Sequence, residues 1–344
     1  MENHSHGTPD PAGDRTVLKT QALLQFGNAL GQEDIWLMEE RALRVMLRDP
    51  AGFLFSAQVL PRDMSARAPE TAPRSRAGSV ALLSLVGPIL YRGSWWADFL
   101  GLPTIQGFQA RFRQALNDDS IKSIVIDVDS PGGEVPGVQE LAAEILAARE
   151  RKQIVAVANP QAASAAYWIA SAAGELVVTP SGEVGSVGVW AGHVDLSKAL
   201  DMEGVKITLI SAGEFKTEGN PWEPLTEEAR VALQERVDEV HTQFVRDLAK
   251  ARNVTTSEVK ANFGKGRMMS AKKALAAGMV DRIATLDQVL GRLGVPAQAR
   301  QGAAAALEPE PEALAPIAPE PETQLDPAVL EAARTRELEI LEVS

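Results

Sequence analysis

The sequence predicts an α/β fold in which parallel strands are connected by crossover helices. A strand candidate, a turn and a helix candidate follow one another three times between residues 80 and 173. Parallel neighbours need a crossover connection, so repetition of this unit implies a parallel sheet. With 344 residues, of which 45% are hydrophobic, the chain can bury a full core.

The first two units precede residue 150. Residues 80–86 form an apolar strand candidate that ends at Gly87-Pro88, and residues 104–117 have the apolar spacing of a helix. Residues 121–128 are a near-continuous aliphatic strand, which stops at the sequence Asp-Ser-Pro-Gly-Gly. A helix is expected to resume at residues 138–149. The apolar face of the first helix consists of Ile105, Phe108, Phe112 and Leu116.

The third unit contains the most informative stretch of the chain. Residues 154–158 have the length and β-branched content of a buried strand, and Asn159-Pro160 breaks it. A helix of small residues follows, so Ser164 is expected at a strand-to-helix junction, near unpaired backbone N–H groups. Alanines on both sides keep the space around its hydroxyl open for a substrate backbone.

Six further elements are expected after this unit. Residues 176–178 and 205–210 are strand candidates, and residues 180–188 form a glycine-rich turn. Residues 211–224 are loop-like. The long amphipathic pattern at residues 226–252 predicts a helix capped by Thr226, and another helix starts at Ser270 and ends at Gly278.

Composition divides the chain into three parts. Residues 1–78 are expected to be an N-terminal extension with one amphipathic helix at 34–48 and a linker at 61–78 rich in Pro, Arg, Ala and Ser. Residues 79–296 form the globular domain. Residues 297–344 form a flexible acidic tail rich in Pro, Ala and Glu, with a terminal helical pattern.

Charge and residue usage exclude several functions. The net charge of −12 argues against a general nucleic-acid binder. The absence of cysteine excludes disulfides, thiolate metal sites and cysteine nucleophiles. There is no run of about 18 apolar residues, so we expect no membrane anchor and a cytoplasmic protein. We expect neither a cofactor nor a metal ion.

A catalytic Ser164 needs a base, and the chain has four histidines. His4 and His6 lie in the polar start and His241 lies within the long helix, which leaves a Ser-His-Asp triad through His193 as one alternative. The other is a lysine that burial keeps neutral. Lys216 lies in a glycine-containing loop, whereas Lys122, Lys198 and Lys206 are typical of surface positions.

The Gly-Gly pair at positions 132 and 133 supplies a third component. It follows a buried strand, and glycine lets the backbone approach a bound carbonyl and direct an N–H at it. Gly132 or Gly133 could thus complete an oxyanion hole with the Ala165 N–H. Ligand sites in such sheets lie at the carboxyl ends of strands.

Five motifs together resemble the S49 serine peptidases, a family that includes signal peptide peptidase A and phage capsid proteases of the lambda protein C type. By this resemblance Ser164 is the nucleophile, Lys216 the general base and Ser186 the hydroxyl that holds the lysine, while Gly132, Gly133 and Ala165 donate to the oxyanion. The implied fold is the ClpP/crotonase-like α/β spiral. The motifs are Asp-Ser-Pro-Gly-Gly (129–133), Ala-Ala-Ser-Ala-Ala-Tyr-Trp-Ile-Ala-Ser-Ala-Ala (162–173), Thr-Pro-Ser-Gly-Glu-Val-Gly-Ser-Val-Gly-Val (179–189), Gly-Glu-Phe-Lys (213–216) and Gly-Met-Val-Asp (278–281).

Two departures from the family pattern bear on which branch of the family the chain resembles. The family commonly has Ser-Gly-Gly-Tyr where this chain has Ser-Ala-Ala-Tyr, and the chain holds one catalytic unit without a membrane anchor. The resemblance therefore implies a serine endopeptidase of the phage or prophage head-maturation type, in the cytoplasm or the procapsid, with capsid or scaffold proteins as partners. It also implies a homo-oligomer in which Lys216 reaches the Ser164 of a neighbour.

Three alternatives remain open. One is a degradative peptidase like signal peptide peptidase A, and another is a crotonase-type acyl-CoA enzyme, which would use the Gly-Gly site without Ser164 or Lys216. The third is a scaffold without activity. For a peptidase, the alanines near Ser164 and the valines at 184, 187 and 189 predict an apolar pocket for the residue before the cleaved bond.

Overall fold

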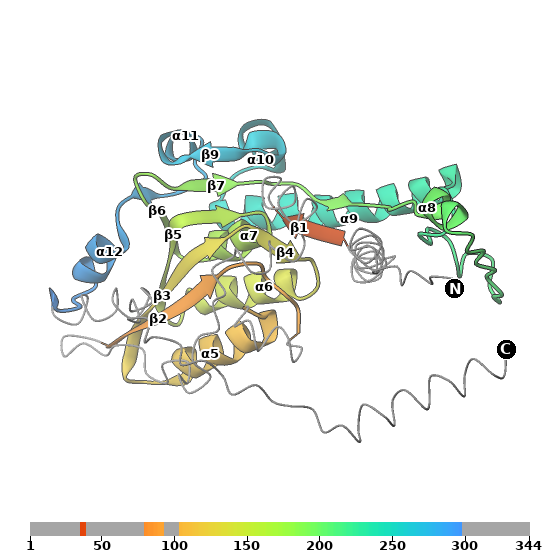
Figure 1. Cartoon of the computed structure of the whole chain (residues 1–344). Coiled ribbons are helices and arrows are strands. Elements are labelled where there is room, and N and C mark those ends of the chain that lie inside the picture. Colours follow the sequence, from red (N-terminus) through yellow and green to blue (C-terminus); the bar gives the residue numbers. More distant parts are fainter. Residues whose placement is uncertain (1–34, 39–78, 93–102, 298–344) are drawn as a thin grey trace, which may run out of the picture. The chain divides into compact units, whose positions relative to one another are not determined.

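The computed structural model describes residues 35–38, 79–92 and 103–297 (Figure 1). Within these residues a mostly parallel sheet has the strand order β10-β6-β5-β3-β2, and β7 and β9 extend it beside β5. The five ordered strands are β2 (Ser79–Val86), β3 (Ile121–Ser130), β5 (Gln153–Ala163), β6 (Glu175–Val178) and β10 (Arg282–Ile283).

Helices connect the parallel strands as the sequence predicts. Helix α5 (Ile105–Asn117) lies between β2 and β3, α6 (Val138–Ala148) between β3 and β5, and α7 (Ala165–Ser171) between β5 and β6. The predicted α/β class with crossover helices is therefore confirmed. Thr104 caps α5 by accepting from the Gly107 amide at 3.1 Å.

Both faces of the sheet are buried, which explains why its strands are apolar throughout. Ile124, Ile126 and the other residues that face α5, α6 and α7 belong to the larger core. Their neighbours Val125, Val155 and Val157 face the opposite side and pack with Leu290 of α12 (Leu286–Arg292). Successive residues of a strand point to opposite faces, so each strand contributes to two cores.

The short strand β7 (Glu183–Gly185) lies beside the end of β5. It pairs in parallel with residues 161–163 and antiparallel with β9 (Met268–Ser270). The predicted glycine-rich turn at 180–188 therefore includes a strand. Gly185 has a φ of +133°, and a Cβ there would lie 2.7 Å from the Arg267 carbonyl oxygen. Only glycine fits this crossing of two backbones.

Helix α9 (Glu227–Arg252) confirms the predicted long helix. The Thr226 hydroxyl accepts from the Ala229 amide at 3.2 Å, as expected for its cap. Helices α10 (Thr256–Asn262) and α11 (Ala271–Ala276) follow, together with the 3-10 turn Gly264–Gly266. Phe244 of α9 stacks on Trp168 of α7 with ring centroids 4.5 Å apart, which fixes α9 against the helix that follows Ser164.

A second, three-stranded sheet has the order β4-β1-β8 and includes an N-terminal segment. Its strands are β4 (Gly132–Glu134), β1 (Ile35–Met38) and β8 (Trp190–Ala191). At residues 35–38 the expected amphipathic helix is therefore wrong. Four consecutive apolar residues are compatible with a strand, and two strands from distant parts of the chain pair with them. Residues 39–48 lie outside the described residues.

Residues 192–226 extend away from the sheet, and we call this segment the arm. It contains α8 (Ser197–Met202), which lies at the right of Figure 1. The predicted strand at 205–210 is wrong: these residues form neither helix nor strand and are largely exposed. A strand needs a hydrogen-bonded neighbour, and residues 205–210 pair with none in the described part of the chain.

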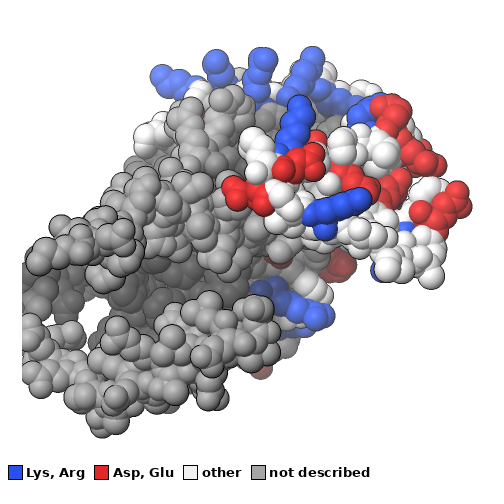
Figure 2. Space-filling view, turned by 45° about the vertical axis from the view of Figure 1, so that its right-hand side comes forward, with Lys and Arg blue, Asp and Glu red and all other residues white. Residues whose placement is uncertain are grey.

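Charged side chains of both signs lie on the described part of the face in Figure 2. On the face in Figure 2, Lys and Arg side chains line the upper edge and Asp and Glu side chains gather toward the right. No helix within the described ranges is both long and apolar enough to span a bilayer. The expected linker at 61–78 and the tail from 298 onward lie outside those ranges.

Candidate active site

Ser164 lies at the junction of β5 and α7, as the sequence predicts. Its side chain is fully buried in the described structure, and its backbone has φ 53° and ψ −116°. Such a conformation is costly for a residue with a Cβ and is found where the surrounding structure enforces it. Two bonds enforce it here: the Ser164 amide donates to the Gly185 carbonyl at 2.8 Å, and its carbonyl accepts from the Trp168 amide at 2.9 Å.

Ser186 lies beside Ser164 on the neighbouring strand. The register pairs Ala163 with Gly185, so the two serines directly follow a paired position. Ser186 is buried and also has a positive φ, 52°. The structure thus brings together the expected nucleophile and the hydroxyl expected to assist it. The Ser164 hydroxyl is 3.5 Å from the Gly188 carbonyl oxygen, a marginal hydrogen bond.

The Asp-Ser-Pro-Gly-Gly turn lies at the same end of the sheet. Ser130 pairs with Ala162. Gly132 and Ser164 each follow this pair by two residues on their own strands, so they lie at a similar height in the sheet. The buried Ser130 hydroxyl donates to the Gly87 carbonyl at 2.7 Å and accepts from the Gly132 amide at 3.2 Å. This engagement of the Gly132 amide favours Gly133 as the oxyanion donor.

Gly133 is held against the segment after β2. The Ile89 amide donates to the Gly132 carbonyl, and the Glu134 amide donates to the Ile89 carbonyl, both at 2.9 Å. A Cβ on Gly133 would lie 2.0 Å from the Ile89 carbonyl oxygen, so no other residue fits. Successive peptide groups of a strand point to opposite sides, hence the Gly133 amide faces away from Ile89.

The second expected oxyanion donor is Ala165, the first residue of α7. The first amides of a helix have no partner within it, so the Ala165 N–H lacks an intrahelical acceptor. Ala165 directly follows Ser164 and is fully buried. Its amide can therefore serve an oxygen bound at the Ser164 hydroxyl.

Lys216 is not brought to Ser164. It lies in an exposed turn of the arm, and its amide donates to the Gly213 carbonyl at 3.3 Å. In Figure 1 helix α8 of the arm lies at the right, away from α7. No hydrogen bond between the Lys216 amine and Ser164 or Ser186 is found among the described residues.

The turn that carries Lys216 is ordered by Asn220, which sequence reasoning missed. The buried Asn220 side chain donates to the Thr217 carbonyl at 2.9 Å and accepts from the Trp222 amide at 3.0 Å. Its signal is the Asn-Pro pair inside a loop. The turn is also tied to the start of α8, because the Leu196 amide donates to the Pro221 carbonyl at 2.7 Å.

His193, the alternative base, belongs to the arm as well. Its Nδ1 donates to the Gly219 carbonyl at 3.2 Å, and its Nε2 is buried without a partner in the described chain. The ring therefore contacts the Lys216 turn and makes no recorded contact with Ser164. His241 lines a pocket beside α9, where burial, and next the charge of Lys260, lower its pKa.

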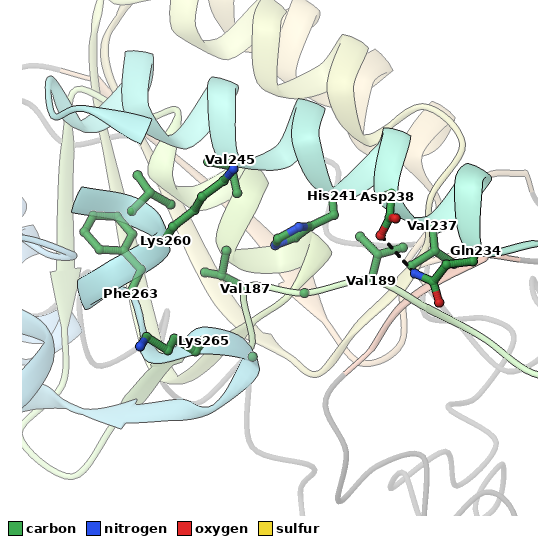
Figure 3. A pocket seen from close by; sticks show the side chains of 13 residues that line it. Val187, Val189, Gln234, Val237, Asp238, His241, Val245, Lys260, Phe263 and Lys265 are labelled. Carbon is green, nitrogen blue, oxygen red and sulfur yellow. Dashed lines mark hydrogen bonds between the residues drawn. The ribbon is translucent and has the colours of Figure 1, made fainter. Parts of the chain in front are cut away.

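That pocket has a volume of about 390 Å³ and adjoins the segment after Ser186 (Figure 3). Val187 and Val189 line one side, and His241 points in from α9. The walls are mixed, since apolar side chains alternate with Asp238, Lys260 and Lys265. Its remaining lining residues are Gly188, Gln234, Val237, Val245, Val259, Phe263 and Gly266.

The Gly-Met-Val-Asp motif (278–281) holds the helix that follows Ser164 in place through hydrogen bonds. The Tyr167 hydroxyl of α7 donates to the Met279 carbonyl at 2.9 Å. Asp281 accepts from Arg252 at 2.7 Å and from the Leu176 amide at 2.7 Å. The motif therefore fixes α7, α9 and β6 relative to one another. Its aspartate has a structural role in this arrangement.

A buried carboxyl, that of Asp127, lies beside the Asn159-Pro160 part of β5. Asp127 of β3 accepts from the Asn159 side-chain amide at 3.1 Å. Burial raises the pKa of Asp127 to about 6, and this hydrogen bond offsets part of the rise. Within the described ranges no three His, Asp or Glu side chains are grouped as a metal site requires.

Comparison with known proteins finds a peptidase family with a similar sequence. Residues 147–300 match the model of peptidase family S49. The chain is 32% identical over 204 residues to capsid assembly protease C of Escherichia phage lambda, covering 59% of this chain and 46% of that protein. It is 31% identical over 204 residues to head-tail preconnector protein GP5 of Enterobacteria phage P21, covering 59% and 40%.

A protein of a bacterium is also similar to part of the chain. The chain is 28% identical over 189 residues to a putative signal peptide peptidase SppA of Enterococcus faecium, covering 55% of each protein. The match to each of the two phage proteins spans less than half of that protein's length. Residues 147–300, which contain Ser164, Ser186 and Lys216, are thus similar to peptidase family S49.

Proposed function

We propose that this protein is a serine endopeptidase with Ser164 as nucleophile and Lys216 as general base. The observation that carries the proposal is the strained backbone of Ser164, held at the carboxyl end of β5 beside Ser186 and the Gly133 strand. A buried serine in such a conformation is typical of an activated nucleophile on a sharp strand-to-helix turn.

The chemistry follows from this geometry. The Ser164 Oγ attacks a substrate carbonyl carbon while the neutral Lys216 amine takes its proton, and the Gly133 and Ala165 amides hold the oxyanion. The lysine then protonates the leaving amine as the peptide C–N bond breaks. Water, deprotonated by the same lysine, hydrolyses the acyl-enzyme and returns the proton to Ser164.

The separation of Lys216 from Ser164 supports a shared site. Lys216 lies in an exposed turn, and burial of its amine against a second copy of the chain would favour the neutral form that a general base needs. We therefore propose a homo-oligomer in which the arm of one copy covers Ser164 of the next.

Exposed apolar side chains of the arm support this assembly. Ile210 is 95% exposed and Met202 is 84% exposed, and Phe215 beside Lys216 is also exposed. Val194, Val205 and Ile207 of the arm are exposed as well. Several exposed apolar side chains within one short segment favour an interaction site there. The partner proposed here is another copy of the same chain.

For the substrate, we propose peptides with an apolar residue before the cleaved bond. The alanines around Ser164 and the valines at 187 and 189 offer no charge to a bound side chain. The charged members of the nearby pocket come from α9, α10 and the turn after it. Peptide libraries that showed a strong preference for a charged residue at this position would contradict the proposal.

We further propose a role in processing capsid or scaffold proteins during phage or prophage head assembly. Two relatives support it by name, a capsid assembly protease and a head-tail preconnector protein. The cytoplasm or a procapsid would be the place of action. A degradative role is the second candidate, supported by the relative named as a putative signal peptide peptidase.

The dyad is tested by substituting each member in the full chain. Ser164→Ala and Lys216→Ala should each reduce hydrolysis of an unfolded protein substrate by at least a hundredfold, because nucleophile and base act as a unit. Lys206→Ala is the matched control, since this lysine is also exposed on the arm, and it should retain activity. If either dyad variant kept more than about a tenth of wild-type activity, the assignment is wrong.

A further inference from the structure

Strand β1 occupies a space between two parts of the site. It runs antiparallel to β4 on one side, where Met38, Leu37 and Trp36 face Gly132, Gly133 and Glu134. On its other side it runs antiparallel to β8, where Ile35 and Trp36 face Ala191 and Trp190. An N-terminal segment is thus inserted between the glycine strand and the chain just after Ser186.

The register places Leu37 opposite the favoured oxyanion donor. The Gly132 carbonyl and the Glu134 amide both bond Ile89, so the peptide groups of Gly133 face the other side, where β1 lies. Leu37 is the residue that pairs with Gly133. The backbone of Leu37 therefore lies where a substrate carbonyl would meet the Gly133 amide.

Both strands that hold β1 continue into the surroundings of Ser164. Strand β4 begins two residues after Ser130, which pairs with Ala162. Strand β8 begins two residues after Gly188, whose carbonyl is the acceptor nearest the Ser164 hydroxyl. The space between β4 and β8 is therefore at the catalytic end of the sheet.

We propose that this space is the peptide-binding slot of the enzyme and that residues 35–38 are its internal occupant, which competes with substrate. The slot takes an extended peptide by strand addition, with main-chain hydrogen bonds on both edges. Catalysis at the slot rests on the proposed function, whereas occupancy by β1 does not. Position 37 holds an apolar residue, in agreement with the specificity proposed above.

The register also indicates which side of a substrate is held more firmly. Trp36 pairs with Glu134 on one edge and with Trp190 on the other, whereas Met38 pairs with Gly132 alone. If Leu37 precedes the cleaved bond, the residues before the bond are held on two edges and those after it on one. The bond presented to Ser164 is then Leu37–Met38.

In an assembled enzyme this bond would be cleaved. The Ser164 Oγ would bond to the Leu37 carbonyl carbon, the Leu37–Met38 C–N bond would break, and the proton taken from Ser164 would pass to the Met38 nitrogen. Water would then release a fragment of residues 1–37 with a Leu37 carboxylate. The slot would become free for other peptides.

Occupancy is tested by peptide binding to a protein that cannot cleave. The probe is a fluorescent peptide with the sequence of residues 31–42, added to full-length Ser164→Ala protein. Leu37→Pro in that background removes an N–H on the β4 side and cannot pair there. If β1 occupies the slot in about nine-tenths of the molecules, the apparent affinity for the probe peptide is about tenfold weaker than that of an empty slot. Leu37→Pro should therefore tighten binding of the probe by about tenfold.

Two further variants control for folding and for proline itself. Trp36→Pro removes the amide on the β8 side and should tighten binding in the same direction. Ala72→Pro lies between Pro69 and Pro73, outside β1, and should leave the affinity unchanged. Unaltered affinity in both β1 variants, with unfolding transitions like that of the Ser164→Ala parent, would overturn the proposal.

Intact-mass spectrometry of wild-type protein separates the two proposals. A fragment ending at Leu37, absent from Ser164→Ala and Leu37→Pro proteins, supports both. If wild-type protein cleaves added peptides while β1 variants bind the probe no better than controls, the slot assignment fails alone. If the β1 variants bind more tightly and no protein or peptide is cleaved, the proposed function fails and the slot stands.

Discussion

Ser164 and Ser186 leave two neighbouring parallel strands at the same register, and each has a positive φ. The angles are 53° and 52°, and the residues before them, Ala163 and Gly185, are paired. Such conformations cost of order 1–3 kcal/mol each for residues with a Cβ. Neighbouring backbone holds them in place, through Gly185 for Ser164 and through Arg267 for Ser186.

We predict that Ser186→Ala lowers kcat/KM about tenfold, because a hydroxyl that positions the base takes no part in bond making. Ser186→Gly is the control for backbone strain. Full activity of Ser186→Ala would contradict the assigned role.

The buried Asp127 makes stability depend on pH. Its pKa is raised from 3.8 to about 6, chiefly by burial, so the folded state binds the proton more tightly than the unfolded state. The contribution of this group to stability is complete below about pH 4, decreases as pH rises toward 6, and is lost above that. A difference of two pKa units corresponds to about 3 kcal/mol.

Asp127→Asn should therefore stabilise the protein at pH 8 by up to about 3 kcal/mol and have little effect at pH 4. The asparagine oxygen can still accept from the Asn159 amide, as the carboxyl does at 3.1 Å. Urea unfolding at the two pH values measures both free energies. An equal effect of the substitution at pH 4 and pH 8 would show that Asp127 does not titrate as described.

The Gly-Met-Val-Asp motif gives a prediction on stability. Asp281→Ala removes the carboxylate partner of Arg252, whose side chain is 7% exposed and keeps only the Gly278 carbonyl as an acceptor in the described chain, and it frees the Leu176 amide. We expect a loss of about 2–4 kcal/mol in the free energy of unfolding. Arg282→Ala, which breaks a surface pair with Glu175, should cost less than about 1 kcal/mol.

The parallel sheet could be predicted because its signal is local. Residues 121–128 are aliphatic at nearly every position, which a strand buried on both faces requires. The position of Ser164 at a strand-to-helix junction could be predicted from the helix of small residues that follows it. The expected break of the strand at Asn159-Pro160 is wrong, because β5 continues through this pair to Ala163, where β7 pairs with it. The roles of Asp127 and Asn220 depend on side-chain contacts inside the fold, and the sequence alone does not show these.

The two wrong elements have a common cause. The sequence Val-Lys-Ile-Thr-Leu-Ile at 205–210 alternates as a strand does, yet it has no neighbouring strand in the described chain. The apolar residues at 35–38 fit a helix, yet β4 and β8 pair with them from 94 or more residues away. Strand formation depends on a partner, and no local pattern encodes where the partner is.

The final prediction concerns the distance between arm and nucleophile. Ser164 is buried at the centre of the fold and Lys216 is exposed on the arm, so a site completed within one chain would need the arm to fold back. If instead neighbouring copies share sites, mixing inactive Ser164→Ala with inactive Lys216→Ala protein creates sites with an intact Ser164 from one chain and an intact Lys216 from the other.

After exchange of subunits, an equimolar mixture of the two variants should recover about a quarter of wild-type activity, since random pairing leaves that share of sites complete. Each variant alone should stay inactive at the same total concentration, and dilution should reduce the recovered activity if assembly is reversible. A mixture as inactive as its components, while subunit exchange is demonstrated by native mass spectrometry, would show that each chain builds its own site.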